Sequence, residues 1–334
     1  MLCIFCLKDR PPSDEHVFPE AIGGTLVIHR VCKPCNDILG SQVDAKLVDH
    51  YLIIMSRAAC GIAGKGGKVP DAFKALGAGR LASDPEQRIR VSVPANGGKP
   101  ILKLAPRKMT GVENGQQFVR LMIDSQDYPD LGDMIQKMRV RVGMPPLSDS
   151  ELAGELTRAI ESSRAIEQPQ VIHNPKIDLI YFQAGIFKIA YELAWYWFGD
   201  DFLEDAEAAK LRKVVLNPTS LERPESTGLA ATIKISDDAG PLALWQHRRH
   251  AHIGMAMRSG KNMMLTIRIF NTMSAIVCVS KNGDRYPNFA LSPDGQFIEI
   301  DPRQKTERQS TILAELGRLT AESLAIAESR TVPS

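Results

Sequence analysis

The first part of the chain alternates short extended segments with turn residues and then changes to a helical pattern. Residues 15–18 and 26–31 are rich in apolar and β-branched side chains, and Gly23-Gly24 stand between them. This order predicts a short β-hairpin. From residue 34 to residue 47 the apolar positions favour a helix. The pattern therefore predicts a hairpin followed by a helix.

A glycine-rich stretch after this helix indicates a domain boundary. Residues 51–62 are able to continue helically, but glycines then recur up to Gly67, and Pro70 follows. Glycine and proline are the residues that most often interrupt regular structure. We therefore predict a module at residues 1–60, a hinge at 61–70 and a second domain at 71–334.

The longer second part mixes strand and helix patterns. Two alternating runs flank Asn96-Gly97-Gly98 and predict a hairpin, and Ser148 with Glu151 has the form of a helix-capping box. The aromatic and aliphatic residues 177–198 are expected to form the core helix of this part. The other expected elements are a third strand at 117–123, strands between 263 and 300, and a terminal amphipathic helix at 306–330. Together these patterns predict an α+β fold.

Composition and charge exclude several classes of protein. With 334 residues, of which 44% are apolar, the chain is long enough for two globular domains. The apolar residues 177–198 include Lys188 and Glu192, whereas a membrane span needs about 20 mostly uncharged residues. No pattern of a secretory signal opens the chain, so we expect a cytoplasmic protein that does not bind membranes. The net charge of +2 means that any surface for nucleic acid must be local.

The cysteines are the first sign of chemistry. Four of the six form two Cys-x-x-Cys pairs, Cys3 with Cys6 and Cys32 with Cys35. In a reducing compartment this clustering indicates metal binding rather than disulfides. Four thiolates suit a tetrahedral zinc ion with no open position, so we predict a structural zinc site. Taken alone, the cysteines also fit a zinc ribbon that only binds a partner.

The segment between the two cysteine pairs carries a further motif. It contains Glu15-His16-Val17-Phe18-Pro19 and then Gly23-Gly24, and Asn36 directly follows Cys35. Over roughly residues 1–45 this pattern resembles the HNH (ββα-metal) endonuclease family, in particular its four-cysteine branch. The resemblance implies a zinc-stapled hairpin and helix that bind a catalytic metal ion. It implies Glu15 and Asn36 as ligands of Mg²⁺ or Mn²⁺, and His16 as the general base.

The chemistry of phosphodiester hydrolysis agrees with these roles. A hard cation with oxygen ligands neutralises the phosphoryl oxygens and the leaving oxygen, and Glu15 and Asn36 both offer oxygen. A neutral imidazole, with an unperturbed pKa of about 6.5, can accept the proton of the attacking water. Adjacent residues on a strand point to opposite faces, so Glu15 or His16 must lie at a twist or bulge.

The chain also departs from the family pattern. Glutamate stands at the first position, where aspartate is commoner, and Asn36 stands where a histidine gives the family its name. The middle asparagine has no clear counterpart. His29 lies near that position, and three roles stay open for it: a third metal ligand, a brace for the base, or an exposed strand residue. Asp44 either braces a basic side chain or faces solvent, and we favour solvent.

Three functions from different classes follow from these observations. The leading hypothesis is a metal-dependent endonuclease that acts on nucleic acid, with DNA preferred, in bacterial defence or a mobile element. The second is an HNH effector that is regulated by a small molecule bound to the C-terminal domain. The third is a non-catalytic, zinc-dependent nucleic-acid-binding protein. A homodimer is compatible with all three.

Overall fold

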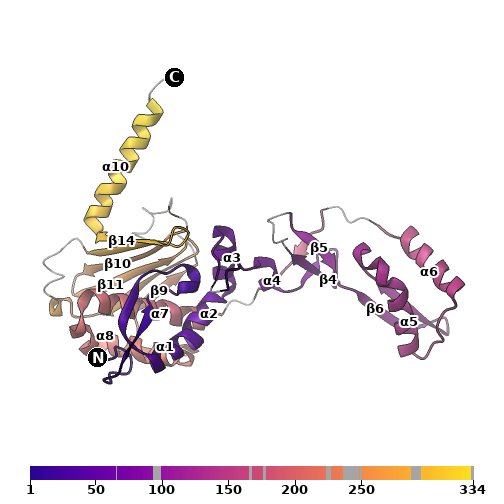
Figure 1. Cartoon of the computed structure of the whole chain (residues 1–334), viewed down its shortest axis with the longest axis horizontal. Helices are drawn as coiled ribbons and strands as arrows, with labels where there is room; N and C mark the ends of the chain where they lie inside the picture. The colour runs from indigo at the N-terminus through magenta and orange to yellow at the C-terminus, as the bar shows by residue number, and fades with distance from the viewer. Residues whose placement is uncertain are drawn as a thin grey trace. The chain divides into compact units, whose positions relative to one another are not determined.

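The computed structural model groups the chain into two compact units (Figure 1). It describes residues 1–64, 66–92, 99–164, 168–175, 178–222, 227–235, 248, 250–286 and 295–331. The first unit combines Met1–Pro70 with Ile177–Ser334, and the second is Asp71–Lys176. The boundary after Pro70 lies at the end of the predicted hinge, and residues 177–334 group with the N-terminal residues rather than with 71–176. The functional division at residues 60 and 70 stays a prediction.

The N-terminal module has the predicted order of hairpin and helix. Its strands, β1 (Pro12–His16) and β2 (Val27–Cys32), are antiparallel. The helical part that follows consists of α1 (Lys33–Ile38), the π-helical segment η2 (Leu39–Asp44), α2 (Ala45–Val48) and α3 (Tyr51–Cys60). A short 3₁₀ helix, η1 (Glu20–Ile22), lies in the hairpin connection. The mixed α+β class and the N-terminal cysteine module predicted from the sequence are confirmed.

Two glycines are required in the hairpin connection because no side chain fits there. A Cβ atom added at Gly24 would lie 1.8 Å from the carbonyl oxygen of Phe18. Gly23 has a φ of +90°, and its Cβ would lie 2.7 Å from the Cα of Pro302. Left-handed backbone and close contact with another backbone both favour glycine. The Gly-Gly motif therefore closes the hairpin connection and allows it to pack against the C-terminal sheet.

A six-stranded sheet forms the centre of the first unit. Its strand order is β14-β13-β10-β11-β12-β9, and all neighbours are antiparallel. The strands are β9 (Ala231–Lys234), β10 (His252–Ser259), β11 (Asn262–Ile269), β12 (Met273–Ser280), β13 (Gln296–Asp301) and β14 (Thr306–Thr311). The predicted terminal helix begins later than expected, at Ile312 in α10 (Ile312–Thr331), because the preceding residues pair with β13.

Helices cover one face of the sheet, and the start of a further helix packs on the other (Figure 1). On one face lie α7 (Leu179–Phe198) and α8 (Ala206–Leu216), and Gly254 of β10 lets α7 approach, since a Cβ there would lie 2.7 Å from Leu193 Cδ1. On the other face, Ile253 and Met255 pack against the start of α10. Short 3₁₀ helices complete the unit: η4 (Asp200–Glu204), η5 (Pro218–Glu222) and η8 (Gly283–Arg285). The predicted core helix is thus α7.

The second unit contains a small sheet, a separate hairpin and helices. The sheet has the order β5-β4-β3-β8, and β6 pairs only with β7. The predicted third strand is thus β7, but it belongs to this separate hairpin. The strands are β3 (Gly79–Leu81), β4 (Asp84–Ser92), β5 (Ile101–Leu104), β6 (Arg107–Glu113), β7 (Gln116–Met122) and β8 (Val171–Ile172). The helices are α4 (Ala72–Leu76), η3 (Ser125–Asp130), α5 (Leu131–Arg141) and α6 (Asp149–Glu161).

Two sequence predictions concern the ends of these elements. The capping box is confirmed: the Ser148 hydroxyl accepts a hydrogen bond from the Glu151 main-chain N–H, and the Glu151 carboxylate accepts one from the Ser148 main-chain N–H. The turn predicted at Asn96-Gly97-Gly98 lies outside the described residues. Among the helices that the structure describes, none is long and apolar enough to cross a membrane.

Candidate active site and metal centre

The four cysteines of the two Cys-x-x-Cys pairs converge at one end of the hairpin. The Sγ atoms of Cys3, Cys6, Cys32 and Cys35 all lie within 4.8 Å of one another. The Sγ atoms of Cys6 and Cys32 are 3.7 Å apart. A tetrahedral zinc ion with Zn–S bonds of about 2.3 Å places its sulfurs about 3.8 Å apart. The cluster therefore has the dimensions of a Cys₄ zinc site.

The local backbone holds these sulfurs in place. Leu7 adopts a left-handed conformation with a φ of 53°, and its N–H donates to the Cys3 carbonyl over 2.9 Å. The N–H of Cys32 donates to Cys3 Sγ over 3.4 Å. Burial opposes ionisation of Cys3, but such main-chain N–H groups lower the pKa of Cys3 to about 7. Burial raises the pKa of Cys35, so a bound cation would have to stabilise its thiolate.

The hairpin has a bulge directly before the predicted catalytic pair. Glu15 pairs with Ile28 and His16 with Val27, but the register shifts between Ser13 and Glu15. Between these pairs, Asp14 of β1 lies opposite both His29 and Arg30, so the additional residue belongs to β2. The side chain of Asp14 is exposed, whereas Glu15 is 2% exposed. A bulge changes the direction in which the neighbouring side chains point. The bulge therefore directly precedes Glu15 and His16, which themselves pair in consecutive register. A common metal site for their side chains stays a prediction.

Asn36 lies against this bulge. It belongs to α1, whose first turn is fixed by Cys35 in the cysteine cluster. Its Nδ2 donates to the main-chain oxygen of Asp14 over 2.6 Å and to Ser13 Oγ over 3.2 Å. With Nδ2 bound to the hairpin, the amide oxygen Oδ1 is the atom that can bind a cation. The structure thus brings Asn36 to the backbone of the residue next to Glu15.

The carboxylate of Glu15 contacts a residue that the sequence reasoning missed. Lys188 Nζ lies 2.6 Å from Glu15 Oε1, and both side chains are buried. In the described part of the chain, no hydrogen bond joins the Glu15 carboxylate to Asn36. Lys188 also lies 3.3 Å from Asp44 Oδ2 and 3.3 Å from Glu192 Oε2. A predicted metal ligand is therefore part of a buried cluster of charges.

The electrostatics of this cluster favour a charged lysine. Burial would lower the pKa of Lys188, but Asp44, Glu192 and Glu15 raise it well above the ordinary lysine value. Burial raises the pKa of Glu192 well above the ordinary value despite the nearby lysine. The expectation that Asp44 faces solvent is wrong, because its carboxylate pairs with the buried ammonium of Lys188. Lys188 and Glu192 are four residues apart in an otherwise apolar helix. This spacing is the signal in the sequence for a buried ion pair.

The two histidines of the hairpin have different surroundings. His16 is half-buried, and within the described part of the chain its imidazole makes no hydrogen bond, while its main-chain oxygen accepts one from Lys188 Nζ over 2.5 Å. His29 is exposed, and its Nδ1 lies 3.0 Å from Asp14 Oδ1. The two imidazoles thus differ: that of His16 has no hydrogen-bond partner among the described residues, and that of His29 is paired with Asp14.

A buried histidine from the C-terminal sheet supports the connection that follows His16. The ring of His252 stacks on Phe18 with centroids 5.4 Å apart. Its Nε2 is 2.9 Å from the Ile22 carbonyl oxygen, and its Nδ1 is 3.3 Å from the main-chain nitrogen of Phe270. These partners fix a neutral ring with its proton on Nε2. No local pattern in the sequence predicts this contact, because its partners lie 230 and 18 residues from His252.

Comparison with known proteins gives one match. Residues 3–52 match the family model described as HNH endonuclease. The matched segment starts at the first cysteine of the cluster and includes the bulge, Asn36 and η2. The HNH resemblance predicted from the sequence is thereby confirmed, and it indicates a nuclease. No curated protein and no solved structure matches the chain significantly.

Proposed function

We propose that the HNH module at residues 3–52 hydrolyses phosphodiester bonds of DNA, in bacterial defence or a mobile element. The observation that carries the proposal is the contact between Asn36 and the Asp14 carbonyl, 2.6 Å long, at the bulge beside Glu15 and His16. It joins the start of α1 to the strand that holds the other two residues. The family match at residues 3–52 supports nuclease activity.

In this proposal the module has two metal sites with different tasks. Zinc at the four cysteines would hold the hairpin against α1, with all coordination positions filled by protein. Glu15 and Asn36 would hold Mg²⁺ or Mn²⁺ through one carboxylate oxygen and one amide oxygen. When bound, such an ion neutralises the phosphoryl oxygens and the leaving 3′ oxygen. These donors fit a hard cation that keeps several water ligands.

His16 supplies the proton transfer. Its half-buried imidazole has no partner among the described residues that would compete for the proton of an attacking water. Positioned general bases of this kind contribute about 10²–10⁴-fold to the rate. Pairing of His29 with exposed Asp14 places a second imidazole on the same hairpin. A role for His29 as a further metal ligand stays a prediction.

Cleavage of supercoiled plasmid by the purified full chain with Mg²⁺ or Mn²⁺ tests the proposal. We expect His16→Ala to reduce the rate by about 10²–10⁴-fold, with unchanged zinc content and DNA affinity. Asp37→Ala is the control, because Asp37 is exposed, pairs with Lys33 and neighbours Asn36. A His16→Ala protein as active as the parent would remove His16 from the mechanism. DNA binding without cleavage would favour the non-catalytic alternative.

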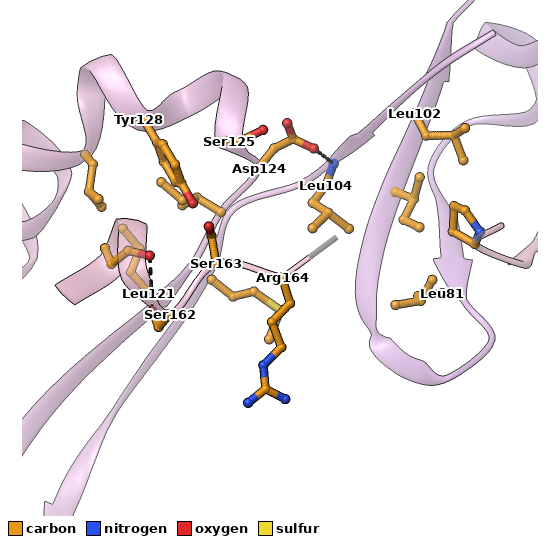
Figure 2. A pocket seen from close by; sticks show the side chains of 16 residues that line it. Leu81, Leu102, Leu104, Leu121, Asp124, Ser125, Tyr128, Ser162, Ser163 and Arg164 are labelled. Atoms are coloured by element: carbon orange, nitrogen blue, oxygen red, sulfur yellow. Dashed lines mark hydrogen bonds between the residues drawn. The ribbon is translucent and has the colours of Figure 1, made fainter. Parts of the chain in front are cut away.

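The ligand-regulated alternative has one observation in its favour. The second unit contains a cavity of about 890 Å³, which is the size of many small-molecule sites. Figure 2 shows leucine side chains on opposite sides of this cavity, Leu81 and Leu102 on one and Leu121 on the other. Asp124 Oδ2 accepts a hydrogen bond from the main-chain N–H of Leu104 over 3.0 Å, so its carboxylate is already bound. Cleavage by the purified protein without an added ligand would argue against this alternative.

A further inference from the structure

The buried ammonium of Lys188 contacts both residues of the predicted catalytic pair. Its side chain is 0% exposed, although it belongs to α7, far along the chain from β1. Nζ lies 2.6 Å from Glu15 Oε1 and 2.5 Å from the main-chain oxygen of His16. One side chain from outside the HNH match thus contacts the carboxylate of one catalytic residue and the backbone of the other.

The distances divide the partners of Lys188 into two groups. An ammonium has three N–H donors, and the two short contacts are those to Glu15 and His16. The contacts to Asp44 and Glu192 are each 3.3 Å, and the contact to the Val17 carbonyl is 3.4 Å. Asp44 and Glu192 therefore attract the ammonium electrostatically, while its closest contacts are to the catalytic pair.

The short contact also limits what the Glu15 carboxylate can do. Its Oε1 atom lies 2.6 Å from Lys188 Nζ. A carboxylate held through one oxygen can bind a cation through the other, and hydrogen bonding of a ligand carboxylate fixes its orientation. The contact to the His16 carbonyl similarly restrains the peptide from which the imidazole projects.

We propose that Lys188 is a positioning residue of the nuclease site: it orients the Glu15 carboxylate toward the catalytic cation and fixes the His16 backbone. The inference rests on the proposed function, because it assigns Glu15 to that cation and His16 to proton transfer. A lysine that served only the fold would not alter how Glu15 binds a metal ion. Metal affinity therefore separates the two roles.

The experiment measures Mn²⁺ binding by electron paramagnetic resonance and plasmid cleavage at saturating Mn²⁺, using the full chain loaded with zinc. Lys188→Met keeps the length of the side chain but removes its charge and donors. We expect Mn²⁺ affinity or the cleavage rate to fall by about 10–100-fold, as is typical when a partner of a metal ligand is lost. Lys210→Met is the control, because Lys210 forms a lysine–glutamate pair with Glu207 on α8.

A second variant separates the proposed role of Lys188 from a simple folding defect. Lys188→Met leaves carboxylates buried without their cation, so Lys188→Met/Asp44→Asn/Glu192→Gln removes two of them and retains Glu15. Circular dichroism and zinc content establish whether each variant is folded. The proposal is overturned if the folded triple variant binds Mn²⁺ and cleaves like the parent, if it binds Mn²⁺ more tightly, or if it too fails to fold.

The parent protein distinguishes this proposal from the nuclease assignment. A parent that cleaves DNA, loses cleavage in His16→Ala and tolerates the Lys188 variants contradicts the role of Lys188 alone. A parent that neither binds Mn²⁺ nor cleaves nucleic acid contradicts the proposed function, and the role of Lys188 with it. The expected result is a cleaving parent, a Lys210→Met control like the parent, and Lys188 variants with weakened metal binding or slowed cleavage.

Discussion

Replacing Cys32 by serine should unfold the first unit, and the structure allows an estimate of the size of this effect. Cys32 is fully buried, and its Sγ lies 3.7 Å from Cys6 Sγ in the four-cysteine cluster. Structural zinc sites contribute about 10–16 kcal/mol at neutral pH, and a domain is stable by only about 5–15 kcal/mol. The free energy lost with the zinc ion is therefore about as large as the whole free energy of unfolding of the unit.

The unfolding caused by Cys32→Ser should extend beyond the hairpin. Cys3, Cys32 and Cys35 belong to the same hydrophobic core as residues of α7 and of the six-stranded sheet. Phe5, between the first two cysteines, contacts the ring of Tyr191 with centroids 4.9 Å apart. We expect one cooperative calorimetric transition of the first unit to disappear or to shift to much lower temperature in Cys32→Ser.

Zinc content by mass spectrometry and unfolding by differential scanning calorimetry measure this effect. The matched control is Cys60→Ser, because Cys60 is half-buried on α3 and lies outside the four-cysteine cluster. It should retain one zinc ion per chain and unfold near the parental Tm. A Cys32→Ser protein with parental zinc content and Tm would refute the reasoning, as would a disulfide between any two of the four cysteines.

Two further predictions concern stability. Burial lowers the pKa of His252 to about 4. Because an unfolded histidine has a pKa of about 6.5, the unfolded state binds more protons between these values, and the free energy of unfolding should fall by about 3 kcal/mol as the pH drops from 6.5 to 4. Urea unfolding should show a weaker pH dependence for His252→Asn, and equal slopes would contradict this. A fragment of residues 1–64 should bind zinc but lack fixed tertiary structure, because its core is completed by α7; a well-dispersed NMR spectrum of that fragment would contradict the prediction.

Local signals in the sequence were sufficient to predict the hairpin, the cysteine cluster and several helices. Cys-x-x-Cys spacing, Gly23-Gly24 and the Ser148 capping box each act within a few residues, so their consequences can be predicted without tertiary structure. The six-residue π-helical segment Leu39–Asp44 was not predicted. It lies within the stretch expected to be one continuous helix, and its last residue, Asp44, contacts Lys188. Such a helix distortion depends on tertiary contacts that no local pattern contains.

The environment of Glu15 could not be predicted for a related reason. Lys188 is 172 residues from His16 in the sequence, and nothing in a periodic pattern states which distant helix will pack on a hairpin. A hairpin and a short helix bury too little surface to enclose a carboxylate by themselves. Here α7 supplies both the missing core and the buried cation, since Gly185 approaches Leu47 while Lys188 reaches Glu15. The same helix therefore completes the core of the module and holds its acidic residue, so substitutions in α7 should alter the environment of Glu15 both through packing and through the loss of a buried charge.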